Sequence, residues 1–114
     1  MPSQTQKTNI ANAIQSIRNA QNLLQPLINA APTVSIAIKL TNEYNSLDTC
    51  LSQLLHAKNS ADDGVFSSAA GVLKSQAGGL QMDEKAIKAI ISDVAIADQV
   101  VGHIGEAIRY IAMC

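Results

Sequence analysis

The sequence predicts an all-α protein: a single four-helix bundle-like domain spanning residues 1–114, with a long C-terminal helix. Hydrophobic residues make up 47% of the 114 residues but aromatic residues only 3%, so the core must be aliphatic, which suits closely packed helices. Apolar residues recur at the 3.6-residue period of a helix along most of the chain. No segment alternates apolar and polar residues as a half-buried strand does.

The first helix is predicted over residues 4–31. Ser3 and Gln6 have the spacing of a capping box at its start. Pro26 lies inside the apolar stripe and removes one backbone hydrogen bond, so we expect a kink there. Pro32 should end the helix, because the residue before a proline is disfavoured in helical geometry. The stripe consists of Ile10, Ala13, Ile14, Ile17, Ala20, Leu24, Leu27, Ile28 and Ala31.

The second and third helices are predicted over residues 34–58 and 62–77. Thr33 or Ser35 can cap the second helix, and the polar segment KNSADDG separates it from the third. Gly78 and Gly79 should end the third helix, because glycine readily adopts the left-handed conformation found after helix C-termini. The expected inward stripe of the second helix is Ala37, Leu40, Tyr44, Leu47, Leu51 and Leu54.

The fourth helix is predicted over residues 84–113, with Asp83 as its cap and Met82 packing on Ile87 as a hydrophobic staple. No proline interrupts this segment, and at 1.5 Å per residue it would be about 45 Å long. Its heptad a and d positions are all apolar, which is typical of coiled-coil-like packing. They are Ile87, Ile90, Val94, Ala97, Val101, Ile104, Ile108 and Ile111.

A second stripe follows the c and g positions of the same helix. It predicts the partner-binding residues of the protein: Ile96, Val100, His103, Ala107 and Tyr110. A helix that is apolar over so much of its circumference must be covered on two sides. Either both sides pack within the bundle, or one meets another subunit or partner. Gly102 and Gly105 each cost about 1 kcal/mol inside a helix, which close approach by another backbone, or local bending, would explain.

The segment HIGEAIRY, from His103 to Tyr110, gathers most of the potentially reactive groups. Its H-x-x-E spacing is the reverse of the Glu-x-x-His motif of di-iron bundles and occurs once. The heptad places Glu106 on the exposed side, away from His103. Cys50 and His56 are six residues apart and point away from each other on one helix. We therefore predict no catalytic residue, no metal ligand and no bound cofactor.

The charge distribution bears on the partners. The net charge is −1 and the basic residues are scattered, so the sequence lacks the basic patch that nucleic-acid binding requires. No acidic residue precedes Glu43, and the polar face of the first helix is mostly Asn and Gln. An amide-rich face suits contact with another protein chain, although drift in a protein of low charge gives the same pattern.

The two cysteines, Cys50 and Cys114, match no zinc or C-x-x-C pattern. No apolar run approaches the length of a membrane span, and the N-terminal segment lacks the apolar region of a signal peptide. These features favour a cytoplasmic protein, and a mature secreted form would look the same.

Together these patterns predict a non-enzymatic helical protein-binding module, in the manner of an adaptor, chaperone or immunity protein. It is expected to self-associate, as a homodimer, through its C-terminal helix. Two alternatives stay open: a structural subunit that uses the first helix as a second contact surface, and a helical bundle that binds a small ligand near Pro26 and the two glycines.

Overall fold

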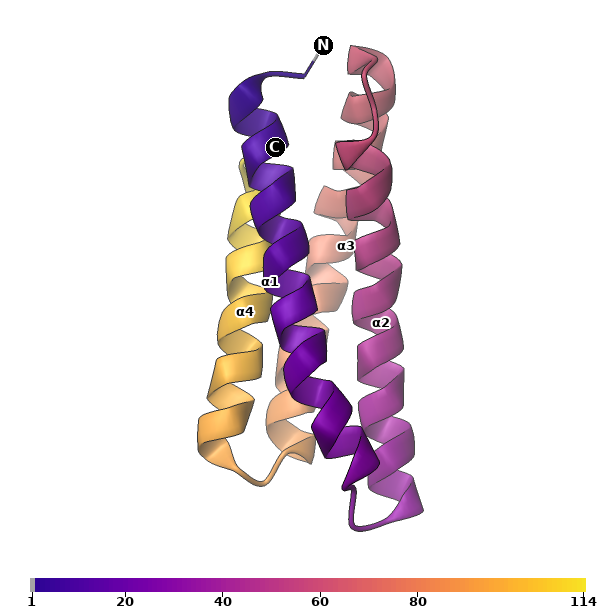
Figure 1. Cartoon of the computed structure of the whole chain (residues 1–114), viewed down its shortest axis with the longest axis vertical. Coiled ribbons are helices and arrows are strands. Elements are labelled where there is room, and N and C mark those ends of the chain that lie inside the picture. Colours follow the sequence, from indigo (N-terminus) through magenta and orange to yellow (C-terminus); the bar gives the residue numbers. More distant parts are fainter. Residues whose placement is uncertain (1) are drawn as a thin grey trace.

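A computed structural model describes residues 2–114, and within this range the chain forms four α-helices and no strand (Figure 1). They are α1 (Gln4–Asn29), α2 (Val34–Lys58), α3 (Asp63–Ile90) and α4 (Val94–Ala112). Each helix runs antiparallel to the next through a short connection, as in an up-down-up-down bundle. The prediction of an all-α four-helix bundle is confirmed.

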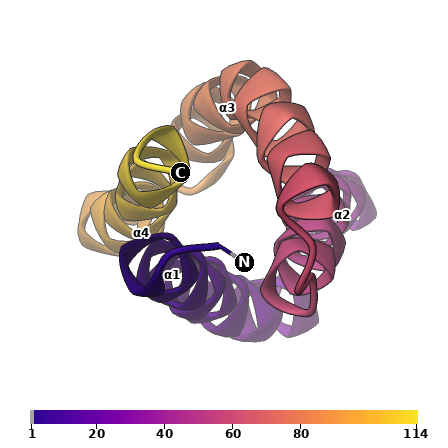
Figure 2. The same cartoon turned by 90° about the horizontal axis from the view of Figure 1, so that it is seen from above.

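The helices form a square in which α1 contacts α2 and α4, and α3 also contacts α2 and α4 (Figure 2). The bundle measures 48 × 21 × 20 Å. Its core is almost wholly aliphatic, as the composition predicted, with Phe66 as the buried aromatic residue. The largest fully buried side chains are Ile10, Ile17, Leu24, Leu47, Cys50, Leu54, Leu73, Ile87, Val100, Ile104 and Ile111.

The start of the chain folds locally as predicted. The Ser3 side chain accepts a hydrogen bond from the Gln6 backbone N–H, and the Gln6 side chain accepts one from the Ser3 N–H, which completes the capping box. α1 continues through Pro26 and ends at Asn29. Thr33 caps α2 by accepting a hydrogen bond from the backbone N–H of Ile36.

The predicted boundary between the third and fourth helices is wrong. Gly78 and Gly79 lie inside α3, and no glycine in residues 2–114 has a positive φ. Each glycine costs about 1 kcal/mol in a helix interior. Burial of Leu80 and Ile87, at about 1.5–3 kcal/mol for each side chain, offsets that cost. The helix therefore continues through the glycines.

The true break is at Ile91, Ser92 and Asp93. Ile91 is extended, and the Asp93 side chain accepts hydrogen bonds from the N–H groups of Ala95 (3.0 Å) and Ile96 (3.3 Å). Asp83 is thus not a cap, and Met82 is 70% exposed rather than packed on Ile87. α4 has 19 residues and α3 has 28, so the prediction of a long C-terminal helix is also wrong.

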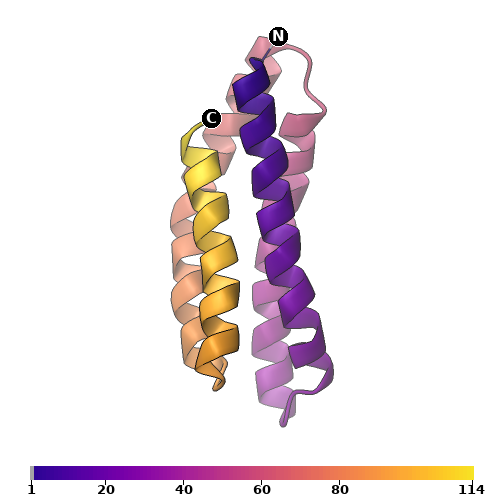
Figure 3. The same ribbon diagram turned by 60° about the vertical axis from the view of Figure 1, so that its left-hand side comes forward.

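Both chain termini lie at the same end of the bundle, where α2 ends and α3 begins (Figure 3). The Lys7 ammonium donates to the carbonyl oxygens of Lys58 (2.8 Å) and Ser60 (2.7 Å). A positive charge is favourable at the negative end of the α2 dipole. The Gln6 side chain donates to the Cys114 carbonyl oxygen at 3.4 Å. Polar contacts therefore close this end of the bundle.

Candidate functional site

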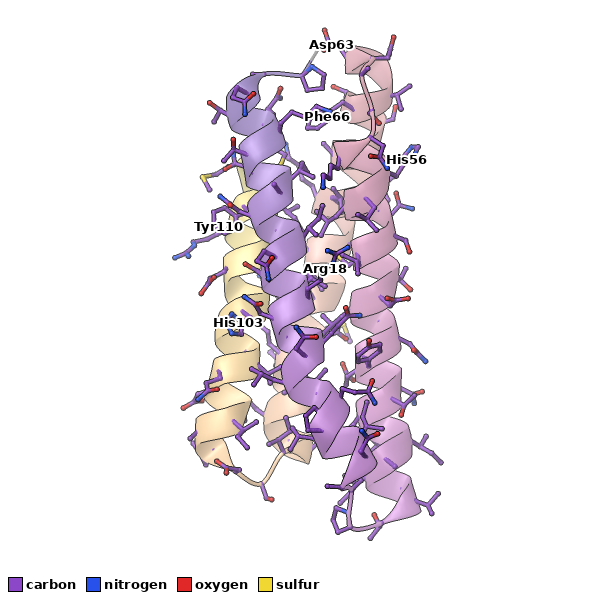
Figure 4. The ribbon with its side chains drawn as sticks, in the orientation of Figure 1. Arg18, His56, Asp63, Phe66, His103 and Tyr110 are labelled. Carbon is purple, nitrogen blue, oxygen red and sulfur yellow. The ribbon has the colours of Figure 1, made fainter. Side chains whose placement is uncertain are left out.

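The predicted partner-binding stripe of α4 faces the interior of the bundle. Val100 and Ala107 are 0% exposed and belong to the core, so the prediction that they form a contact surface is wrong. Ile96 and Tyr110 are half-buried and pack against the same core. His103 is also half-buried. Figure 4 labels His103 and Tyr110, which both lie on α4. Partner binding by these three half-buried residues stays a prediction.

The two predicted stripes of α4 merge into one buried face. Ala97, Ile104 and Ile111 from the first stripe are buried together with Val100 and Ala107 from the second. The opposite side exposes mainly polar residues and small ones, namely Asp98, Gln99, Gly102, Arg109 and Ala112. Within residues 94–114 the large exposed hydrophobic residues are Val94 and Met113, one at each end of the helix. α4 therefore has no second apolar face along its length.

The groups of HIGEAIRY take part in packing. Glu106, expected to be exposed, is half-buried and its Oε2 accepts a hydrogen bond from Ser16 Oγ at 3.4 Å. His103 Nδ1 is buried without a hydrogen-bond partner among the described residues. A Cβ on Gly105 would lie 3.8 Å from Glu84 Oε2, an ordinary contact, and one on Gly102 would meet no neighbour within 4 Å in residues 2–114. The close approach expected at these glycines is not present within the chain.

A buried acidic pair lies between α2 and α3. Asp83 is 9% exposed, and its Oδ2 accepts a hydrogen bond from Ser46 Oγ at 2.7 Å. Glu43 of α2 is half-buried, lies one turn before Ser46 on the same face of the helix, and is near enough to Asp83 for that residue to raise its pKa. Two neighbouring carboxyl groups in a poorly solvated site are more stable when one of them is protonated.

The electrostatics of this pair follow from burial. Burial, and then the neighbouring carboxyl group of Asp83, raise the pKa of Glu43 to about 7. Burial and the same charge raise the pKa of the Cys50 thiol to about 12. Cys50 is therefore an uncharged, unreactive thiol at neutral pH. Burial and the neighbouring Asp83 therefore favour the protonated form of Glu43.

A pocket of about 280 Å³ opens beside the acidic pair. Gln76 Oε1 at this pocket is buried without a hydrogen-bond partner in the described part of the chain. Residues 2–114 contain no group of three or more His, Cys, Asp or Glu side chains that could hold a metal ion. The pocket is lined by Ser46, Thr49, Cys50, Ser75, Gln76, Gly79, Leu80 and Asp83.

Sequence reasoning missed this pair because it assigned Asp83 to a helix cap. The signal was nevertheless present in the spacing of Leu80, Asp83 and Ile87, which are three and four residues apart. On a continuous helix this spacing places all three on one face. An aspartate on an apolar face is a candidate buried acid. Its burial is costly unless another group stabilises it, so a partner is expected nearby.

A second pocket, of about 130 Å³, is lined by residues of the α1–α2 and α3–α4 connections and of the adjoining helices. Figure 1 shows both connections at the end of the bundle opposite the termini. We call this region the uncharged end after its α1–α2 side, although Asp93 on the α3–α4 side also lines the pocket. It comprises the pocket and the exposed Val34, Ile38 and Val94, which are 76%, 55% and 70% exposed. From Asn19 to Ile38 the chain carries no charged residue. The pocket is lined by Leu27, Ala30, Pro32, Ile36, Leu40, Ile90, Ile91, Ser92 and Asp93.

Comparisons with protein-family models, with curated proteins and with solved structures found no match to this chain. Within residues 2–114 no helix is both long enough and apolar enough to cross a membrane.

Proposed function

We propose that this protein is a non-catalytic protein-binding module that associates with a second copy of itself through the uncharged end. The observation that carries the proposal is the exposure of Val34 and Ile38, one turn apart on the outer side of α2. Ile36 and Leu40 point to the other side of the same turns and line the pocket. The start of α2 is thus apolar on two sides, which favours cover from outside the bundle.

The absence of charge supports a second copy as the occupant. In a two-fold dimer the same patch meets itself, so any net charge on it would face the same charge on the partner. The segment from Asn19 to Ile38 avoids this repulsion, since its polar residues are Asn, Gln, Ser and Thr, which leaves Asp93 as the charged residue that lines the pocket. Covering an exposed valine or isoleucine is worth about 1.5–3 kcal/mol when burial is complete.

The interface proposed here differs from the one expected along the C-terminal helix. Val100 and Ala107 are used within the bundle, whereas Val94 at the start of α4 is exposed at the uncharged end. Self-association remains the proposal, and its location moves from the length of α4 to the end where α2 and α4 begin.

The test is the mass of the protein in solution as a function of concentration, measured by light scattering. We expect the mass to rise from 12.0 kDa toward twice that value. Ile38→Glu should hold the protein at 12.0 kDa without loss of helicity, because Ile38 is 55% exposed. Val72→Glu is the matched control, since Val72 is also an exposed β-branched residue, 43% exposed, and lies on α3.

Three outcomes would overturn the proposal. One is a monomer at every concentration. Another is association that Ile38→Glu and Val72→Glu weaken equally, because this would separate self-association from the uncharged end. Large assemblies that Ile38→Glu leaves intact would also contradict it and would favour the structural-subunit alternative.

A further inference from the structure

The contact between Glu43 and Asp83 joins α2 to α3 at mid-length. Asp83 is 9% exposed and is held by Ser46, while Glu43 Oε2 is buried with no hydrogen-bond partner among the described residues. Two neighbouring carboxyl groups in a buried site are more stable when one of them is protonated. Full ionisation would place two negative charges against each other in a poorly solvated site.

The elements around the pair offer little compensation for that second charge. On α2, Cys50 is neutral, and the Asp48 side chain accepts a hydrogen bond from Gln21 of α1 at 3.3 Å. Gln21 also donates to the Tyr44 carbonyl oxygen. Arg18 of α1 is exposed and is not among the groups that shift the pKa of Glu43. On α3, Asp83 is itself the acidic partner, so ionisation of Glu43 adds repulsion.

We propose that the Glu43–Asp83 pair is a proton-dependent latch, and that ionisation of both carboxyl groups loosens the middle of the α2–α3 interface. A pocket of about 280 Å³ lies beside the pair, and water can enter there. Separation of α2 and α3 therefore costs the least free energy at this contact. Cys50 lines the same pocket and is 2% exposed, so loosening exposes its thiol. The proposal is independent of self-association at the uncharged end.

The sign of the pH dependence follows from linkage. The pKa of Glu43 is raised from its ordinary value of 4.5 to about 7 in the folded protein. Between these two pH values the folded state binds more protons than the unfolded state, so stability falls as the pH rises. The stabilisation is fully present below about pH 4.5 and is lost as the pH rises through about 7.

Thermal unfolding of the full chain tests the latch, with Glu43→Gln as the variant that stays neutral at every pH. From about pH 5 to about pH 9, the Tm of the wild-type protein should fall relative to Glu43→Gln by about 4 °C or more. Asp83→Asn should also flatten the difference, because it removes the second charge and its side-chain oxygen can still accept from Ser46. A Tm difference that stays constant with pH overturns the proposal.

Thiol labelling locates the change. In a Cys114→Ser background, the rate at which a dithiodipyridine reagent modifies Cys50 is divided by the rate for the urea-unfolded chain at the same pH, which cancels the ionisation of the thiol. This ratio should rise by about tenfold or more across neutral pH in the wild-type pair and stay level in Glu43→Gln. A ratio that rises equally in both proteins, or in neither, contradicts loosening at this contact.

Discussion

Opposite sides of the bundle are built from different residues: α1 and α4 form one side, and α2 and α3 form the other (Figure 2). Nine hydrophobic residues with zero exposure come from α1 and α4, compared with five from α2 and α3. The nine are Ile10, Ala13, Ile17, Ala20, Leu24, Val100, Ile104, Ala107 and Ile111, and the five are Leu47, Leu54, Ala57, Leu73 and Ile87.

The polar groups are distributed in the opposite way. The side-chain hydrogen bond between α1 and α4, from Ser16 to Glu106, is long at 3.4 Å. The bond between α2 and α3, from Ser46 to Asp83, is 2.7 Å and belongs to an acidic pair beside a pocket of about 280 Å³. A cooperative domain can tolerate a titrating pair in one interface when another interface supplies much of the buried apolar surface. The difference predicts that stability and the proposed pH response depend on different helix pairs.

The largest expected effect is on the α1–α4 side. Val100→Glu places a carboxylate where the wild-type side chain is 0% exposed. A buried, unpaired charge costs more than a domain with a total stability of about 5–15 kcal/mol can absorb. We expect loss of cooperative unfolding and much lower helicity by far-UV circular dichroism, with Val72→Glu on α3 as the folded control. A folded Val100→Glu protein that had merely lost its dimer would restore the α4 interface predicted from the sequence.

That interface was predicted because periodicity identifies an apolar face without saying what covers it. Local signals predicted the helical class, the capping box at Ser3 and the extent of α2. The c and g stripe of α4 was also a true apolar stripe. Its partner, however, lies in α1 and α3 of the same chain. The distinction depends on how helices pack in three dimensions.

The predicted boundary between α3 and α4 was wrong for a related reason. Asp83 and Asp93 are both aspartates that precede apolar periodic residues, so capping chemistry alone does not choose between them. The heptad pattern of apolar residues continues across the true break. Ile87 before the turn at residues 91–93 and Ala97 after it are both buried, so both fit the pattern. A break at Asp93 gives α3 a length of 28 residues, close to the 26 of α1 and the 25 of α2. Because Asp83 was assigned as the cap of the fourth helix, the acidic pair was not predicted.

Truncating one buried side chain on the α1–α4 side and one on the α2–α3 side compares the packing of the two interfaces directly. Ile104 is 0% exposed on α4, and Ile104→Ala should lower the free energy of unfolding by about 2–5 kcal/mol through lost burial and the cavity left behind. Cys50→Ala removes a 2% exposed thiol that already borders a pocket, so its cost should stay under about 2 kcal/mol. Urea unfolding monitored by circular dichroism gives both values. Equal costs would show that the two interfaces are equally well packed.

Adding a small group to each side gives the smallest effects, with opposite signs. Ala107 is 0% exposed, so Ala107→Val should destabilise by about 1–3 kcal/mol through overpacking. Gly79 lines the α2–α3 pocket, and a Cβ there meets no neighbour within 4 Å in the described chain. Gly79→Ala should therefore stabilise by about 0.5–1 kcal/mol, because alanine favours the helix and the space is open. Urea unfolding of both variants checks the signs, and destabilisation by Gly79→Ala would mean that the α2–α3 interface is closed in solution.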